Sequence, residues 1–168
     1  MNRRTFVKTT GATTLAATAA GAAAATPSYI EAVKGLIADW RRKDIDAVLA
    51  RVTDDVVWYS HVGTVPKIGK PAMRAFLEAF GASLTDVRWR IFAYATSGQQ
   101  IFVEGVDDFV LVAEKRRVAI PYMGVMTFRG SLISEWRDYF DRGLFDRLKA
   151  GDPVPPEIAK LLDRPAVS

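Results

Sequence analysis

Four extended segments follow one another in the second half of the chain, and this succession limits the possible folds more than any other feature. They cover residues 86–95, 100–113, 118–128 and 132–140, with Ser97-Gly98, residues 114–117 and Arg129-Gly130 as the turns between them. Strands joined by turns this short pair in antiparallel fashion. The sequence therefore predicts three consecutive hairpins that form an antiparallel meander.

The first half of the chain predicts helices around one strand. Apolar residues recur at helical spacing over 26–42, 44–50 and 71–80, whereas 56–61 is extended. We therefore expect an α+β fold, a cone-shaped curved antiparallel sheet with the N-terminal helices packed on its concave face and a pocket between them. This catalytic domain is expected to span 26–150, and a Pro-rich C-terminal tail with a short helix follows over 151–168.

The first 25 residues differ from the rest of the chain and are expected to lie outside the fold. Arg3-Arg4 precede Phe6 and Lys8, and a weakly apolar run rich in Ala, Thr and Gly then leads to Ala23-Ala24-Ala25. This pattern resembles a twin-arginine signal peptide, which would direct export to the bacterial periplasm. The alternative is an N-terminal tail on a cytoplasmic protein. The apolar run is too short to span a membrane permanently.

Composition excludes several classes of site and partner. The chain has no cysteine and a single histidine, so disulfides, thiolate chemistry and multi-histidine zinc sites are excluded. Lys and Arg total 23 against 19 Asp and Glu, but three basic residues belong to the predicted signal, which leaves 20 against 19. A nearly neutral mature chain gives no support for a nucleic-acid partner. P-loop and Rossmann glycine patterns are also missing from the sequence, and we expect no cofactor.

Alternation along two of the candidate strands, 100–113 and 132–140, places two aspartates on faces that also carry large apolar side chains. Asp138 shares one strand face with Trp136 and Phe140, and Asp107 shares another with Phe109. If these faces are inward, burial disfavours the charge on each carboxylate, which is costly unless the group is paired or used. The alternative is that the alternation is read one residue out of phase and Asp138 is a solvated edge residue.

A tyrosine and the histidine complete the candidate set. Tyr59 and His61 share one face of the 56–61 strand, so four polar groups from three strands would meet in the pocket. Taken singly, a tyrosine or a histidine on a strand is more often a structural residue than a catalytic one. Two inward carboxylates are harder to explain structurally, because like charges in a dry site raise each other's pKa.

These residues resemble a known family. The similarity covers roughly residues 28–149, and its most specific part is the run from Glu135 to Asp141; Gly124-Val125, Val103 to Asp107, Tyr59 to His61 and Phe145 also contribute. The pattern is similar to that of the limonene-1,2-epoxide hydrolases, within the superfamily of nuclear transport factor 2, ketosteroid isomerase and the small polyketide cyclases. The resemblance implies the cone fold, the location of the pocket and a homodimer.

The resemblance also implies roles for the four candidates. In the family, one aspartate, a tyrosine and an asparagine hold and deprotonate a water, a second aspartate protonates the epoxide oxygen, and an arginine bridges both carboxylates. Asp138 matches the base, Asp107 the acid and Tyr59 the tyrosine, whereas His61 stands at the asparagine position and Gly105 at the arginine position. In place of this arginine, a basic side chain could reach inward from Arg88, Arg90 or Lys67, whereas strand parity sends Arg137 to the opposite face.

Three functions follow from this reading. The first is hydrolysis of an apolar epoxide by water that Asp138 activates, with Asp107 as acid. The second uses the same groups without water as reactant, in a cofactor-free lyase, isomerase or cyclase, and the third is a non-catalytic small-molecule binding module. An apolar terpenoid, polyketide or aromatic substrate is suggested by the predicted pocket residues Trp136, Phe140, Phe109 and Met126.

Overall fold

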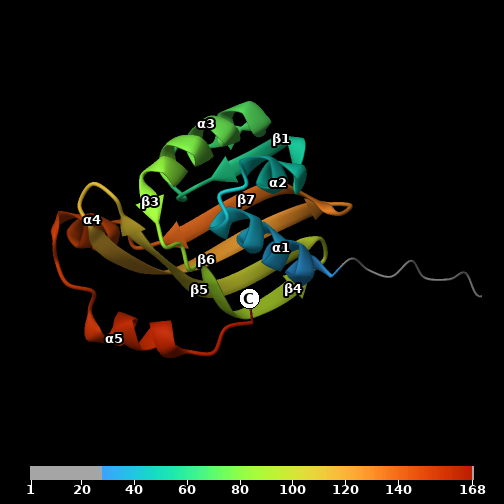
Figure 1. Ribbon diagram of the computed structural model, residues 1–168. Coiled ribbons are helices and arrows are strands. Elements are labelled where there is room, and N and C mark those ends of the chain that lie inside the picture. Colours follow the sequence, from blue (N-terminus) through green and yellow to red (C-terminus); the bar gives the residue numbers. More distant parts are fainter. Residues whose placement is uncertain (1–27, 168) are drawn as a thin grey trace, which may run out of the picture.

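The computed structural model describes residues 28–167, in which a curled sheet is covered by helices (Figure 1). The helices are α1 (Tyr29–Arg41), α2 (Ile45–Ala50), α3 (Gly69–Ala82), α4 (Arg142–Ala150), α5 (Pro156–Ala159) and the 3-10 helix η1 (Lys160–Asp163). The strands are β1 (Val52–Tyr59), β2 (Lys67–Ile68), β3 (Leu84–Thr85), β4 (Arg90–Ser97), β5 (Gln100–Leu111), β6 (Arg116–Arg129) and β7 (Leu132–Phe140). The predicted export signal lies outside the described residues, so export stays a prediction, as does the homodimer.

The sheet contains the expected meander and one parallel pair that was not expected. Its order is β2-β1-β7-β6-β5-β3, and β4 also pairs with β5. Strands β4 to β7 are antiparallel hairpin neighbours, which confirms the meander. The sheet as a whole is mixed, because β1 runs parallel to β7. No hairpin joins these two strands, so local turn signals carried no information about their relative direction.

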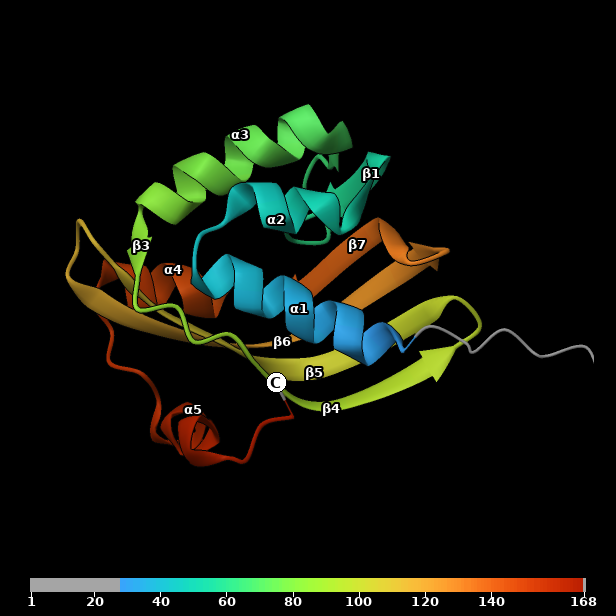
Figure 2. The same cartoon turned by 45° about the vertical axis from the view of Figure 1, so that its right-hand side comes forward.

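The predicted α+β cone with helices on its concave face is confirmed. Figure 2 shows α1, α2 and α3 on one side of the curled sheet and α5 on the other. The inward stripe of α1 is fully or almost fully buried, from Ile30 through Val33 and Leu36 to Trp40. Ser28 precedes this helix, and the predicted start at Thr26 lies outside the described part of the chain. Within residues 28–167, no helix has both the length and the apolar character needed to cross a membrane.

The C-terminal segment packs against the outer face of the sheet. The predicted short helix is present as α5 and η1, whose apolar residues cover the buried Phe92, Val106 and Ala119. The Val167 amide then donates a hydrogen bond to the Ile91 carbonyl oxygen (2.8 Å). The tail is therefore part of the described fold and shields one end of the sheet from solvent.

Gly105 lets three chain segments approach one another closely at the centre of the sheet. It lies in β5 opposite Tyr122 of β6 on one side and Ile91 of β4 on the other. A Cβ atom at this position would overlap the Arg90 carbonyl oxygen and lie 3.0 Å from Cε1 of Tyr122. Only glycine fits here without moving the backbone of β4.

We expect Gly105→Ala to lower the free energy of unfolding by about 2 kcal/mol or more, because the added methyl group forces β4 away from β5. Gly98→Ala is the comparison, since Gly98 has a positive φ of 56° but open space around its missing side chain. That change should cost only about 1 kcal/mol. Urea unfolding of both variants measures the difference, and equal costs would contradict the close approach.

Candidate functional site

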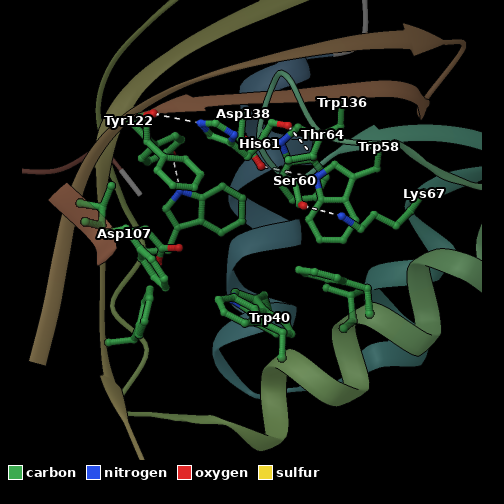
Figure 3. Close-up of a pocket in the computed structure, with 18 of the residues that line it drawn as sticks. Trp40, Trp58, Ser60, His61, Thr64, Lys67, Asp107, Tyr122, Trp136 and Asp138 are labelled. Atoms are coloured by element: carbon green, nitrogen blue, oxygen red, sulfur yellow. Dashed lines mark hydrogen bonds between the residues drawn. The ribbon is translucent and has the colours of Figure 1, made fainter. Parts of the chain in front are cut away.

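An aromatic cavity of about 290 Å³ lies between the helices and the concave face of the sheet (Figure 3). All four tryptophans of the chain line it, with phenylalanines from α3, β5, β7 and α4. A volume near 300 Å³ is at the lower end for small-molecule sites. The polar groups of the cavity are few and come from separate elements: Asp107, Tyr122, Asp138, Ser60, His61, Thr64, Lys67 and Arg142.

Asp138 enters the cavity from β7 and is held by two indoles. Its carboxyl oxygens accept hydrogen bonds from Nε1 of Trp136 (2.7 Å) and Nε1 of Trp58 (3.4 Å). The parallel β1–β7 register sets these two tryptophans side by side, with ring centres 5.1 Å apart. Gly124 lies opposite Asp138 on β6, where even a Cβ atom would lie 3.4 Å from Oδ1. Because Gly124 has no side chain, the carboxyl group of Asp138 packs directly beside the backbone of β6.

Asp107 enters the same cavity from β5 with less support. Its Oδ1 atom is buried and has no hydrogen-bond partner among the described residues. The neighbouring Asp108 points to the other face of the sheet, where Arg117 pairs with it at 2.5 Å. The expected inward phase of β5 is therefore correct, and Asp107 presents an unused polar atom to a ligand.

Burial changes the protonation of both carboxyl groups. It raises the pKa of Asp107 to about 7, with a further increase from the Asp108 charge. It also raises the pKa of Asp138 to about 7, against the lowering effect of the Trp136 and Trp58 hydrogen bonds and with repulsion from Asp107. Two interacting carboxyl groups of this kind share protons near neutral pH. The indole donors favour the charged form of Asp138, so we assign Asp138 as the base and Asp107 as the acid.

Tyr122 is a cavity residue that the sequence analysis did not single out. Its hydroxyl oxygen accepts a hydrogen bond from Nε1 of Trp89, whose ring stacks on Trp136 at 5.5 Å. Burial raises the pKa of Tyr122 well above its usual value, and both cavity aspartates add to this. Its hydroxyl proton therefore remains available to a ligand oxygen. Tyr122 shares a strand face with Ile120 in the 118–128 segment, and this alternation could have indicated that Tyr122 points inward. Trp89 lies in an irregular stretch before β4, where no alternation indicates the direction of its side chain.

Tyr59 does not reach the cavity, which corrects one of the predicted positions. It pairs with Arg137 of β7, and both side chains lie on the face opposite to that of Trp58 and Trp136. His61 does line the cavity, because β1 ends at Tyr59 and the strand alternation ends with it. Nε2 of His61 lies 3.2 Å from the Phe140 carbonyl oxygen. A carbonyl oxygen only accepts, so Nε2 is the donor in this contact.

Three of the four predicted apolar pocket residues line the cavity, namely Trp136, Phe140 and Phe109. The fourth, Met126, is fully buried in the core and is not among the lining residues. It shares a face of β6 with Tyr122 but lies further along the strand, near the end where Tyr29 of α1 stacks on Phe128 at 4.3 Å. Strand parity fixes the face of a residue and leaves its depth undetermined.

Two long basic side chains line the cavity, Lys67 and Arg142, and Arg142 pairs with Asp146 at 3.0 Å. Arg88 pairs with Asp86 outside the cavity, the Arg90 guanidinium donates to the Leu162 carbonyl oxygen, and Arg137 lies on the outer face as predicted. Of the three basic residues predicted to take the place of the family arginine, Lys67 lines the cavity. No cluster of three or more His, Asp or Glu side chains suited to a metal ion is found in residues 28–167.

Comparison with protein families matches residues 33–136 to the SnoaL-like domain. The matched part is more than half of the chain and includes β1, all of β4 to β6 and β7 as far as Trp136. No protein of curated function matches the sequence significantly.

Solved structures with the same fold have different assigned activities. A limonene-epoxide-hydrolase-like epoxide hydrolase of Mycobacterium tuberculosis is 23% identical and has a TM-score of 0.63, covering 82% of this chain and 94% of its own. A protein assigned as a SnoaL-like polyketide cyclase from Shewanella denitrificans is 17% identical with a TM-score of 0.68, covering 75% and 99%. A Burkholderia pseudomallei protein of unknown function is 22% identical with a TM-score of 0.66, covering 73% and 98%. At these identities the likeness establishes the fold alone.

We expect Asp107→Asn and Asp138→Asn each to raise the free energy of unfolding by about 2–4 kcal/mol at about pH 8. The unfolded carboxyl group ionises near 3.8, whereas the folded group keeps its proton up to about 7. Between these values the folded state binds more protons, so the stability of the natural protein falls as the pH rises. Urea unfolding at several pH values should show the gain shrinking towards about pH 4. Asp54→Asn, at an exposed position, is the control, and a gain independent of pH would contradict the assignment.

Proposed function

The chain belongs to the SnoaL-like domain family, and we propose that it is a cofactor-independent enzyme that transfers protons on an apolar small molecule. The observation that carries the proposal is the pair of buried carboxyl groups, Asp107 and Asp138, facing one aromatic cavity with pKa values of about 7. An ideal catalytic acid or base has its pKa close to the working pH. Structural aspartates are instead paired with cations, as Asp108 is with Arg117.

The chemistry that fits best is proton abstraction next to a carbonyl group, as in an isomerase or cyclase. Asp138, charged through its indole donors, removes the proton from carbon. Asp107, protonated, and the Tyr122 hydroxyl then donate hydrogen bonds to the enolate oxygen that develops. Returning the proton at another carbon, or attack of the enolate on an electrophilic carbon, gives an isomer or a ring.

Epoxide hydrolysis is the second candidate, and the same two aspartates favour it. Asp138 would deprotonate a water that attacks a ring carbon, and Asp107 would give its proton to the epoxide oxygen. The rest of the water-holding set differs from the family pattern. Tyr59 lies outside the cavity, His61 donates to the Phe140 carbonyl oxygen, and Gly105 leaves no space for an arginine. These differences rank hydrolysis below proton transfer.

We expect Asp138→Asn to lower kcat by about 10²–10⁴ and Asp107→Asn by a similar factor, on any substrate found by screening ketones, enones and epoxides. The natural protein should have its highest kcat/KM near neutral pH, because one carboxyl group must be charged and the other protonated. Asp54→Asn, outside the cavity, should keep full activity. Retention of activity in the Asp138 variant would remove the proposed base.

Isotopes distinguish the two reactions in a single pair of incubations. In heavy water, isomerisation should place deuterium on a carbon of the product, whereas in oxygen-18 water, hydrolysis should place the label in a diol. Diol oxygens are the ones to measure, since carbonyl oxygens exchange with water unaided. Carbon-bound deuterium without oxygen-18 supports an isomerase, a cyclic product without oxygen-18 supports a cyclase, and a diol that carries oxygen-18 supports a hydrolase.

A further inference from the structure

The edge strand β2 has its apolar side chain in solvent and its charged side chain in the cavity, which is the reverse of what burial favours. Ile68 is 65% exposed, whereas Lys67 lines the cavity, set opposite Trp58 by the β1 register. An exposed isoleucine contributes no burial free energy to the folded state, and a lysine inside the cavity loses part of its hydration, so both orientations lower the stability of the fold. Fold stability therefore does not explain this arrangement, and such local exceptions are expected where function requires them.

The ammonium group of Lys67 has no acidic partner among the described residues. Its Nζ donates to the Ser60 hydroxyl oxygen at 2.6 Å and lies 4.3 Å from the centre of the Phe76 ring and 5.8 Å from that of Trp58. Partial burial lowers its pKa. Lys70, three residues further on, forms an ion pair with Asp54 at 2.8 Å. Lys67 thus presents N–H donors and an uncompensated charge to the cavity.

Lys67 and Asp107 lie apart in the cavity. Figure 3 shows Lys67 and Asp107 entering from opposite sides, with tryptophan rings between them. A negative ligand group would be repelled from the carboxyl pair and attracted to Lys67, where Ser60 supplies a hydroxyl next to the ammonium group. A ligand with an anionic group at one end would therefore bind in a single orientation.

We propose that Lys67 binds an anionic oxygen group on the substrate and so directs the reacting carbon to Asp138 and Asp107. The inference rests on the proposed function for the reaction at the other end of the cavity. It narrows the substrate class to compact apolar molecules that carry one carboxylate or one ionised enol or phenol oxygen. The cavity volume of about 290 Å³ restricts the apolar part to a small ring system.

The test compares adamantanecarboxylate with its uncharged amide as probes on the full-length protein. Every tryptophan of the chain lines the cavity, so intrinsic fluorescence reports binding there. We expect the carboxylate to bind about tenfold tighter than the amide, or more, in line with a charge-assisted hydrogen bond. Lys67→Met should remove this preference by weakening carboxylate binding alone, and Lys67→Arg should keep most of it.

Matched variants separate this inference from the proposed function. Lys70→Met removes a nearby lysine outside the cavity and should leave the preference unchanged. Asp138→Asn should lower kcat by about 10²–10⁴ and leave the preference for the carboxylate in place, so a failure of the proposed chemistry does not alter the binding result. Three results would each overturn the role of Lys67. They are equal affinities for the two probes in the natural protein, no binding of either probe, and a preference for the carboxylate that survives in Lys67→Met.

Discussion

The hydrogen bonds from Trp58 and Trp136 to Asp138 are the interactions on which the rest of the site depends. Without these donors, burial and the Asp107 charge would raise the pKa of Asp138 further and make it a poorer source of the charged form. The two indole N–H groups stabilise its anion without bringing in a full positive charge. The Trp136 bond is local to β7, whereas the Trp58 bond depends on the parallel β1–β7 register, which sets Trp58 beside Trp136. The sheet topology thus supplies one of the two donors to Asp138.

The cavity has three chemical regions built on one aromatic wall. The carboxyl pair can exchange protons near neutral pH, Tyr122 offers a hydroxyl proton, and Lys67 supplies a positive charge on the side of the cavity opposite Asp107 (Figure 3). Stacked rings of Trp58, Trp136 and Trp89 connect these regions. An arginine between the carboxyl groups would lower both pKa values. Gly105 leaves no space for an arginine at its position, which is consistent with chemistry that needs one carboxyl group protonated.

Local patterns in the sequence predicted most of the fold and about half of the site. The hairpins and the inward faces of Asp107 and Asp138 followed from turn residues and period-two alternation. Tyr59 was placed wrongly because alternation was extended to His61, beyond the end of β1. The parallel pairing of β1 was not predicted either. It depends on contacts between residues about 80 positions apart, and hydrophobic periodicity within a segment does not indicate which distant segment it pairs with.

That same pairing has a consequence for how the molecule reaches its native state. The meander from β4 to β7 can form early, since each of its contacts closes a short stretch of chain. Trp58 meets Trp136 only after the intervening segment has been brought together, which carries a larger entropic cost. The binding chamber is therefore expected to form after the hairpins. An intermediate with the hairpins complete but β1 undocked would have a solvated Asp138 and no enclosed space for a ligand.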